Sequence, residues 1–246
     1  RIIKDIARNL DAEHIDATTT YETNTVEIPE TNLIDLSLTN RKLNSTTHYR
    51  LDLPGLYQQY NLPVVLSACD WLVDKGWKLP ADQIKTALKQ VMTLTGFAGR
   101  FEVLSDHPKI VLDVAHNQDG MQELIRQFPF HQDKLKKLFI IIGMVKDKEI
   151  DAVLSMLPKK AIYYFTKAQI PRALPEQLLA ERASSHGLHG VPFSDVNSAL
   201  VHALATACAN DIILVCGSVF VVGEVNRELI ASHKNISKAT PEVRSI

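Results

Sequence analysis

Short apolar strands alternate with helices through the second half of this chain, and this alternation most constrains its fold. We expect strands at Ile110–Asp113, Leu138–Gly143, Ala161–Lys167 and Ile212–Cys216. We expect helices at Asn117–Gln127, Lys148–Leu157, Pro175–His186, Asp195–Ala209 and from about Val219, with a short candidate strand at Val191–Phe193. Repeated strand–helix units of this length predict an α/β fold: a mostly parallel sheet covered by helices on both faces.

The first half of the chain has a different pattern. Apolar residues alternate with polar ones around Leu36 and again around Leu51, with a polar stretch between them, which predicts an antiparallel hairpin. A helix is expected from Leu56 to Lys75, interrupted near Pro63, and another from Pro80 to Met92. The glycine-containing stretch 93–99 follows and separates the two patterns. We therefore expect two domains, residues 1–98 and 99–246.

Charge and composition exclude some partners. The 246 residues carry 27 basic and 28 acidic side chains, a net charge of -1, so no bulk attraction to nucleic acid or to an anionic membrane is expected. No apolar run reaches the length of a membrane span. The three cysteines have no metal-ligand spacing and sit in apolar runs. We expect a cytoplasmic protein, a monomer, and, because the sequence begins at Arg1 inside a helical pattern, a fragment or a processed chain.

Polar side chains gather where the strand ending at Leu112 meets the next helix. Asp113, His116 and Asn117 follow one another there. In open parallel sheets, ligands bind outside the carboxyl ends of the strands, beside helix N-termini. Asn117 alone is best interpreted as a helix cap. A cap needs only one of these residues, so Asp113 and His116 are candidates for contact with a ligand.

The usual phosphate-binding loops are missing from this sequence. None of its ten glycines is followed by Lys and then Ser or Thr, and there is no Gly-x-Gly-x-x-Gly fingerprint. The second half therefore does not read as a dinucleotide-binding domain, and the chain by itself does not read as a complete P-loop ATPase.

Four segments, in order, resemble folylpolyglutamate synthase, often also dihydrofolate synthase, of the Mur ligase superfamily. They are Leu53–Asn61 (LPGLYQQYN), Gly99–Glu102 (GRFE), Leu112–Asn117 (LDVAHN) and Cys216–Glu224 (CGSVFVVGE). The resemblance implies the end of a P-loop ATPase domain followed by a Rossmann-like domain of the Mur ligase C-terminal type. It also implies an ATP-dependent ligase that joins L-glutamate to folate, and to dihydropteroate, through an acyl phosphate. The phosphate loop and the Mg²⁺ ligands of that family would lie upstream of Arg1.

The resemblance also implies roles for individual residues. Asn61 would bind the adenine edge of ATP, Arg100 the phosphates and Asp113 the ribose hydroxyls. His116 would lie near the phosphates or the reacting carboxylate, as the catalytic candidate. Three of them have a plainer alternative: a helix-entry residue for Asn61, an interdomain salt bridge for Arg100 and a strand-end acid for Asp113.

Two further positions are candidates for binding the incoming glutamate. Lys146 belongs to a charged loop, Lys146-Asp147-Lys148, that follows a strand, and such a loop is more often a solvated surface. Ser218 follows the last strand and is equally well interpreted as an N-cap. No residue of this chain is expected to bind a metal.

Two other functions remain open. A Mur-type peptidoglycan ligase would share the arginine and the Asp-x-Ala-His-Asn core, although the Gln-x-x-Asn element ending at Asn61 favours the folate branch. A non-catalytic α/β binding module is the alternative from a different class. A Gly-Lys-Ser-type loop encoded upstream would favour a ligase.

Overall fold

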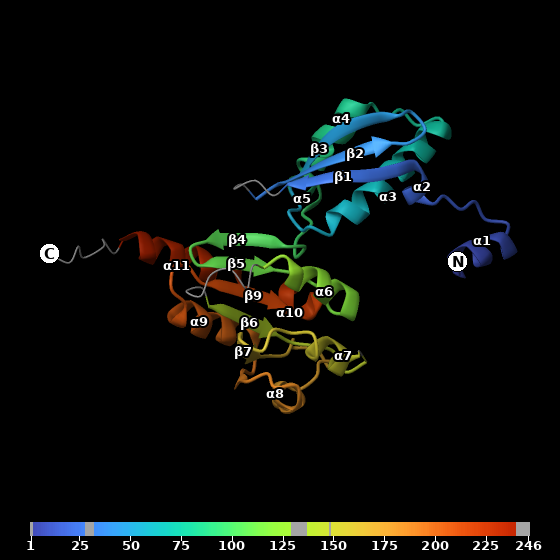
Figure 1. Cartoon of the computed structure of the whole chain (residues 1–246). Helices are drawn as coiled ribbons and strands as arrows, with labels where there is room; N and C mark the ends of the chain where they lie inside the picture. The colour runs from blue at the N-terminus through green and yellow to red at the C-terminus, as the bar shows by residue number, and fades with distance from the viewer. Residues whose placement is uncertain (1, 28–31, 129–136, 148, 240–246) are drawn as a thin grey trace. The chain divides into compact units, whose positions relative to one another are not determined.

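Two units make up the chain in the computed structural model, Arg1–Phe97 and Ala98–Ile246 (Figure 1). The structure describes residues 2–27, 32–128, 137–147 and 149–239. In the described ranges no helix is both long enough and apolar enough to cross a membrane.

The unit 1–97 is built on a three-stranded antiparallel sheet in the order β1-β2-β3. The predicted hairpin is confirmed, because β2 pairs with β3 along the whole length of both strands. Apolar side chains of the sheet pack with Leu62, Leu66 and Leu88 from the helices to form the core. The elements are α1 (Ile2–Asn9), α2 (Ala17–Thr20), β1 (Tyr21–Glu27), β2 (Ile34–Asn40), β3 (Ser45–Leu51), α3 (Gln58–Asp74), α4 (Ala81–Leu88) and α5 (Val91–Thr95).

The prediction that Pro63 interrupts a helix is wrong, because α3 continues through it. Proline has no N–H, so the carbonyl of Gln59, four residues earlier, loses its usual helical partner. In the structure the Thr23 hydroxyl donates to that carbonyl at 2.9 Å. A side chain of β1 thus satisfies the group that the proline leaves open.

The helix predicted from Pro80 to Met92 is two helices. The Asp52 carboxylate explains the second start, since it accepts hydrogen bonds from the N–H groups of Val91 and Met92 at 3.0 and 2.9 Å. These groups open α5, where helical N–H groups have no partner within the helix. The sequence pattern alone did not show this restart, because its cap lies on a distant segment.

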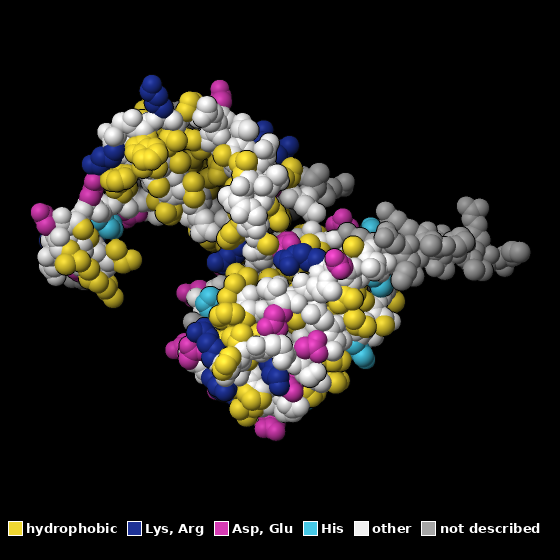
Figure 2. Space-filling model, turned by 180° about the vertical axis from the view of Figure 1, so that it is seen from behind, with side chains coloured by type: hydrophobic (Ala, Val, Ile, Leu, Met, Phe, Trp, Pro, Cys, Tyr) yellow, Lys and Arg dark blue, Asp and Glu magenta, His cyan; other side chains and the backbone are white. Residues whose placement is uncertain are grey.

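Part of the surface of the unit 1–97 is apolar. No residue of α1 is buried, and its side chains Ile2 and Ile3 are exposed. Together with Val64 and Trp71 of α3, this region lines a groove of about 1090 Å³. Figure 2 shows hydrophobic side chains gathered on the surface of this unit. Contiguous exposed apolar surface of this kind is typical of an interface.

The unit 98–246 contains a six-stranded sheet in the order β4-β5-β9-β6-β7-β8. Only β4 runs antiparallel to its neighbour. The strands are β4 (Glu102–Asp106), β5 (Lys109–Leu112), β6 (Leu138–Ile142), β7 (Ile162–Phe165), β8 (Gly190–Pro192) and β9 (Ile212–Cys216). The predicted α/β fold with a mostly parallel sheet is confirmed for this unit.

Helices cover both faces of this sheet. One apolar cluster contains residues of α6 (Gln118–Arg126), α7 (Ile150–Leu154) and α8 (Glu176–Ser185). The other contains residues of α9 (Val196–Thr206), α10 (Val219–Gly223) and α11 (Arg227–Ala239). All five residues of β6 are buried, as expected for a strand covered on both faces.

Strand β4 was not predicted. Its buried positions are held by Glu102 and Ser105 instead of apolar residues, so the strand lacks the usual apolar alternation.

Candidate functional site

The site is built around Asp113, which directly follows β5. Its backbone N–H donates to the Val215 carbonyl at 3.0 Å, so the strand pairing continues to this point. Its side chain is 1% exposed. The two carboxylate oxygens accept hydrogen bonds from the N–H groups of Phe101 and Ala115, both at 2.8 Å. These bonds offset the cost of burying the carboxylate, and they tie two turns together. Contact of Asp113 with a ribose stays a prediction.

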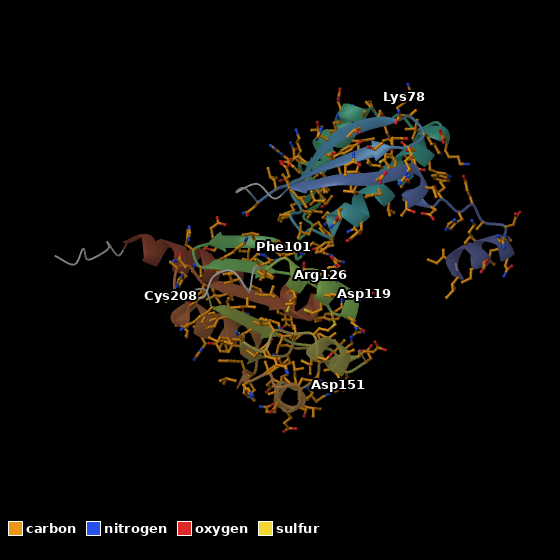
Figure 3. The ribbon with its side chains drawn as sticks, viewed as in Figure 1. Lys78, Phe101, Asp119, Arg126, Asp151 and Cys208 are labelled. Carbon is orange, nitrogen blue, oxygen red and sulfur yellow. The ribbon has the colours of Figure 1, made fainter. Side chains whose placement is uncertain are left out.

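One of these turns carries Arg100. Gly99 has φ +80°, and a Cβ there would come within 2.9 Å of the Val222 side chain, so the position requires glycine. The Gly99 carbonyl accepts from the Val114 N–H at 2.8 Å. On the other side Phe101 has φ 50° and is buried beside β4 and β5 (Figure 3). The backbone on both sides of Arg100 is therefore fixed.

The Arg100 side chain itself is exposed. Within the described part of the unit 98–246 it has no hydrogen bond and no ion pair, so an ion pair inside this unit does not account for it. A guanidinium stays charged and presents a planar set of donors that matches phosphate or carboxylate. The turn thus presents a charge suited to an anionic ligand.

His116 and Asn117 lie on the second turn held by Asp113. His116 is half-buried, and its Nδ1 lies 3.0 Å from the Val114 carbonyl oxygen. A carbonyl only accepts hydrogen bonds, so Nδ1 carries the proton and Nε2 is the nitrogen that can meet a ligand. The Asn117 side chain accepts from the Gly120 N–H at 2.9 Å, which confirms that this residue caps α6.

Ser218 is brought to the same edge of the sheet. The Gly217 N–H donates to the Ala115 carbonyl at 2.9 Å, which joins the turn after β9 to the turn after β5. Ser218 is 4% exposed, and its hydroxyl accepts from the Phe220 N–H at 3.2 Å, so it caps α10. The N-cap interpretation of Ser218 is confirmed, and its contact with glutamate stays a prediction.

Lys146 is anchored by the loop that follows β7. Its N–H donates to the Arg172 carbonyl at 3.1 Å and its Nζ to the Pro171 carbonyl at 3.3 Å. Lys148 of the same charged loop lies outside the described residues. The Arg172 guanidinium sits 5.1 Å from the centre of the Phe220 ring, which brings this loop to the start of α10.

Asn61 belongs to the other unit, in the first turn of α3. Its Nδ2 donates to Oε1 of the buried Gln58 at 3.0 Å. One amide hydrogen is used in this contact, so its second N–H and its oxygen can still pair with a purine edge. The expected helix entry directly before Leu62 and Pro63 is not found, because α3 begins at Gln58 and continues through Pro63. The adenine contact stays a prediction.

Three side chains of the unit 98–246 that matter for the site were not found from the sequence: Glu102, Arg227 and Arg172. Glu102 and Arg227 contact each other across 125 positions of sequence, so no local pattern could join them. For metals, the part of the chain that the structure describes contains no group of three His, Cys, Asp or Glu side chains that could hold an ion.

Comparison with known proteins matches this geometry to one family. The family model of the Mur ligase glutamate ligase domain matches residues 99–219. The dihydrofolate synthase/folylpolyglutamate synthase of Escherichia coli (strain K12) is 35% identical over 133 residues, which are 52% of this chain and 29% of that protein.

Solved structures match over nearly the whole chain. E. coli FolC in complex with ADP, without folate substrate, superposes with a TM-score of 0.71 at 25% identity, covering 95% of this chain and 51% of that one. A bifunctional folylpolyglutamate synthase/dihydrofolate synthase with Mn, AMPPNP and L-glutamate bound gives 0.67 at 25% identity, covering 94% and 50%. The chain therefore spans about half the length of these solved structures. Its sequence match to the E. coli protein covers a smaller share of that protein, 29%.

Proposed function

The chain belongs to the folylpolyglutamate synthase/dihydrofolate synthase family, and we propose that it is the C-terminal part of an ATP-dependent ligase that adds L-glutamate to folate. Dihydropteroate is proposed as a second acceptor. In this proposal the unit 98–246 is the glutamate ligase domain, and the unit 1–97 is the end of the ATPase domain. The setting we propose is the cytoplasm, where three free cysteines would stay reduced.

The observation that carries the proposal is the exposed Arg100 on its fixed turn. Arg100, Asp113 and His116 lie on two turns that the Asp113 carboxylate joins, at the edge where parallel strands end. All three lie within residues 99–219, which match the glutamate ligase model. An exposed cation at this edge supports binding of a phosphate-bearing ligand, because parallel sheets bind ligands there.

The reaction we propose has two steps. The acceptor carboxylate takes the terminal phosphoryl group of ATP, which releases ADP and leaves an acyl phosphate. The amine of glutamate then attacks the acyl carbon, the amide bond forms, and phosphate leaves. Catalysis of this kind depends on positioning and on charge stabilisation.

Residues of this chain would contribute at defined atoms. Arg100 would neutralise charge on the transferred phosphoryl group, and Nε2 of His116 would face the reacting carboxylate. Ser218 and Lys146 would hold the incoming glutamate, and Asn61 would meet the adenine. We propose that the ligands of Mg²⁺ lie outside the described residues, among which no group of three His, Cys, Asp or Glu side chains could hold an ion.

The exposed apolar groove of the unit 1–97 supports the assignment of that unit. Side chains such as Ile2, Ile3 and Trp71 would be costly to leave in water, and a larger ATPase domain would cover them.

The test is ATP-dependent transfer of labelled L-glutamate to tetrahydrofolate and to dihydropteroate. The protein used is the loop-containing form, which carries these 246 residues together with a phosphate-binding loop. We expect transfer with ATP and none with ADP. Transfer of an amino acid to a peptidoglycan precursor, with none to either folate acceptor, would assign the protein to the cell-wall branch instead.

A further inference from the structure

Glu102 contacts two parts of the unit 98–246 that are far apart in the sequence. It is 6% exposed. Its Oε1 accepts from Nε of Arg227 at 3.0 Å, and its Oε2 accepts from Nη2 of the same arginine at 2.9 Å. Oε2 also accepts from the Gly99 N–H at 2.8 Å. One carboxylate therefore connects the first residue of α11 to the residue before Arg100.

A second buried carboxylate holds the other side of the same turn. Asp113 accepts from the Phe101 N–H at 2.8 Å, and the Gly99 carbonyl accepts from the Val114 N–H at 2.8 Å. The backbone on both sides of Arg100 is thus held by buried groups, while its side chain is exposed.

Packing alone does not explain why a carboxylate is buried at position 102. Buried ion pairs are weak evidence for stability, because apolar side chains of similar volume often serve as well. Apolar residues at 102 and 227 could keep α11 on β4, but they could not accept a hydrogen bond from the Gly99 N–H. The two hydrogen bonds from Arg227 fix the direction of the Glu102 carboxylate, and this carboxylate in turn holds the Gly99 N–H in place.

We propose that Arg227 and Glu102 are positioning residues for Arg100. Arg227 orients Glu102, Glu102 holds the Gly99 N–H, and the turn then aims the Arg100 guanidinium. The inference rests on the proposed function, in which Arg100 meets the transferred phosphoryl group. A charge aimed in advance stabilises the transition state without reorganisation at the moment of reaction.

The first experiment is a double-mutant cycle in the loop-containing form. Arg227→Lys keeps a charge but loses the planar fork, so Glu102 is held less firmly. We expect kcat to fall about five- to tenfold, with the KM for ATP changed less than about twofold. In an Arg100→Ala background the same substitution should change kcat less than about twofold, because its effect passes through Arg100.

The matched control is Arg182→Lys. Arg182 also pairs with a carboxylate of the same unit, Asp151, but it lies on α8, and among the described residues its side chain hydrogen-bonds only to Asp151. Wild-type kcat is expected for this variant. The inference would be overturned if Arg227→Lys lowered kcat by the same factor in the wild-type and Arg100→Ala backgrounds. It would also be overturned if Arg182→Lys lowered kcat as much as Arg227→Lys does.

The second experiment needs no activity. Hydrogen exchange of the Gly99 amide is measured in the 246-residue chain, where Glu102 is its acceptor. We expect Arg227→Lys to speed this exchange at least about tenfold relative to the wild type and to Arg182→Lys. Unchanged exchange overturns the inference. If Arg227→Lys does not fold, Glu102→Gln replaces it in both experiments with the same expected direction.

The experiments can contradict the proposed function and the positioning role independently of each other. A loop-containing wild type that transfers no glutamate would contradict the proposed function, and the exchange measurement would then decide the positioning role alone. A wild type that transfers glutamate, with Arg227→Lys acting independently of Arg100, would contradict only the positioning role.

Discussion

Arg100 is the residue from which the proposed phosphate contact can be tested most directly. In the loop-containing form, Arg100→Lys keeps one charge but loses the planar fork. We expect kcat to fall at least about tenfold, since each 1.4 kcal/mol of transition-state stabilisation is tenfold in rate. The Kd for ATP should change little, because the proposed phosphate loop would supply most of the phosphate contacts. Steady-state kinetics and a nucleotide-binding titration measure the two quantities. A defect confined to the Kd would show that Arg100 serves nucleotide docking instead.

Asp113 offers a test of a buried carboxylate that holds two turns. Asp113→Asn places an amide NH₂ where an acceptor is needed, so one of the N–H groups of Phe101 and Ala115 loses its partner. We expect the free energy of unfolding to fall by about 1–3 kcal/mol, the usual cost of an unsatisfied buried group. Urea denaturation measures this, with the exposed Asp106→Asn as the control. Unchanged stability together with a raised KM for ATP would favour direct contact with the ribose.

Local contacts of single residues were predictable from the sequence, and distant ones were not. The Asn117 and Ser218 caps bond to N–H groups within three residues, so a short pattern reveals them. Glu102 depends on Arg227, 125 positions later, and its polarity hid the strand to which it belongs. The exposed Arg100 was found only through a family resemblance, because an exposed arginine carries no signal in the chain itself.

At the scale of elements, the start of α9 depends on a single titrating cap. The Asp195 carboxylate accepts from the Ser198 hydroxyl at 2.6 Å and from the Ser198 N–H at 2.8 Å. These bonds, the hydroxyl first, lower the pKa of Asp195 below its ordinary value of 3.8. A lowered folded pKa means that the stabilisation is present above the ordinary pKa and is lost as the pH falls through the folded value.

We therefore expect Asp195→Ala to lower the free energy of unfolding by about 1 kcal/mol at neutral pH, the usual effect of losing an N-cap. The difference from the wild type should shrink as the pH falls below the ordinary pKa of aspartate. Denaturation curves at several pH values measure it, and Glu181→Ala, exposed on α8, serves as the control. A difference that does not depend on pH would contradict the role of the charged carboxylate.

The helices and strands show why some elements can be predicted from the sequence pattern and others cannot. The four inner parallel strands were predicted because burial on both faces makes each an apolar run that can be recognised by itself. The continuity of α3 through Pro63 was mispredicted because the compensating Thr23 hydroxyl belongs to another element. The start of α5 was missed for the same reason, since its cap is Asp52.

At the scale of the whole molecule, the sequence makes a prediction about this chain by itself. It contains no Gly-Lys-Ser or Gly-Lys-Thr loop, and no described residues form a metal site. Most of the phosphate-binding energy in P-loop enzymes comes from backbone N–H groups and the bound metal. We expect the purified 246-residue chain to show no ligase activity and at most weak ATP affinity. ATP-dependent incorporation of glutamate by this chain would overturn that expectation.

The position of β9 in the sheet also bears on protein synthesis. This strand lies between β5 and β6 and pairs with both, yet among the strands of the described residues it is the last to leave the ribosome. Until residues 212–216 emerge, the β4–β5 hairpin and the β6–β7–β8 group cannot be joined, and both present unpaired apolar edges. Between the completion of β8 at Pro192 and the emergence of β9, the nascent chain therefore carries two separate half-sheets. The late strand that unites them also brings Ser218 and Arg227 to the site.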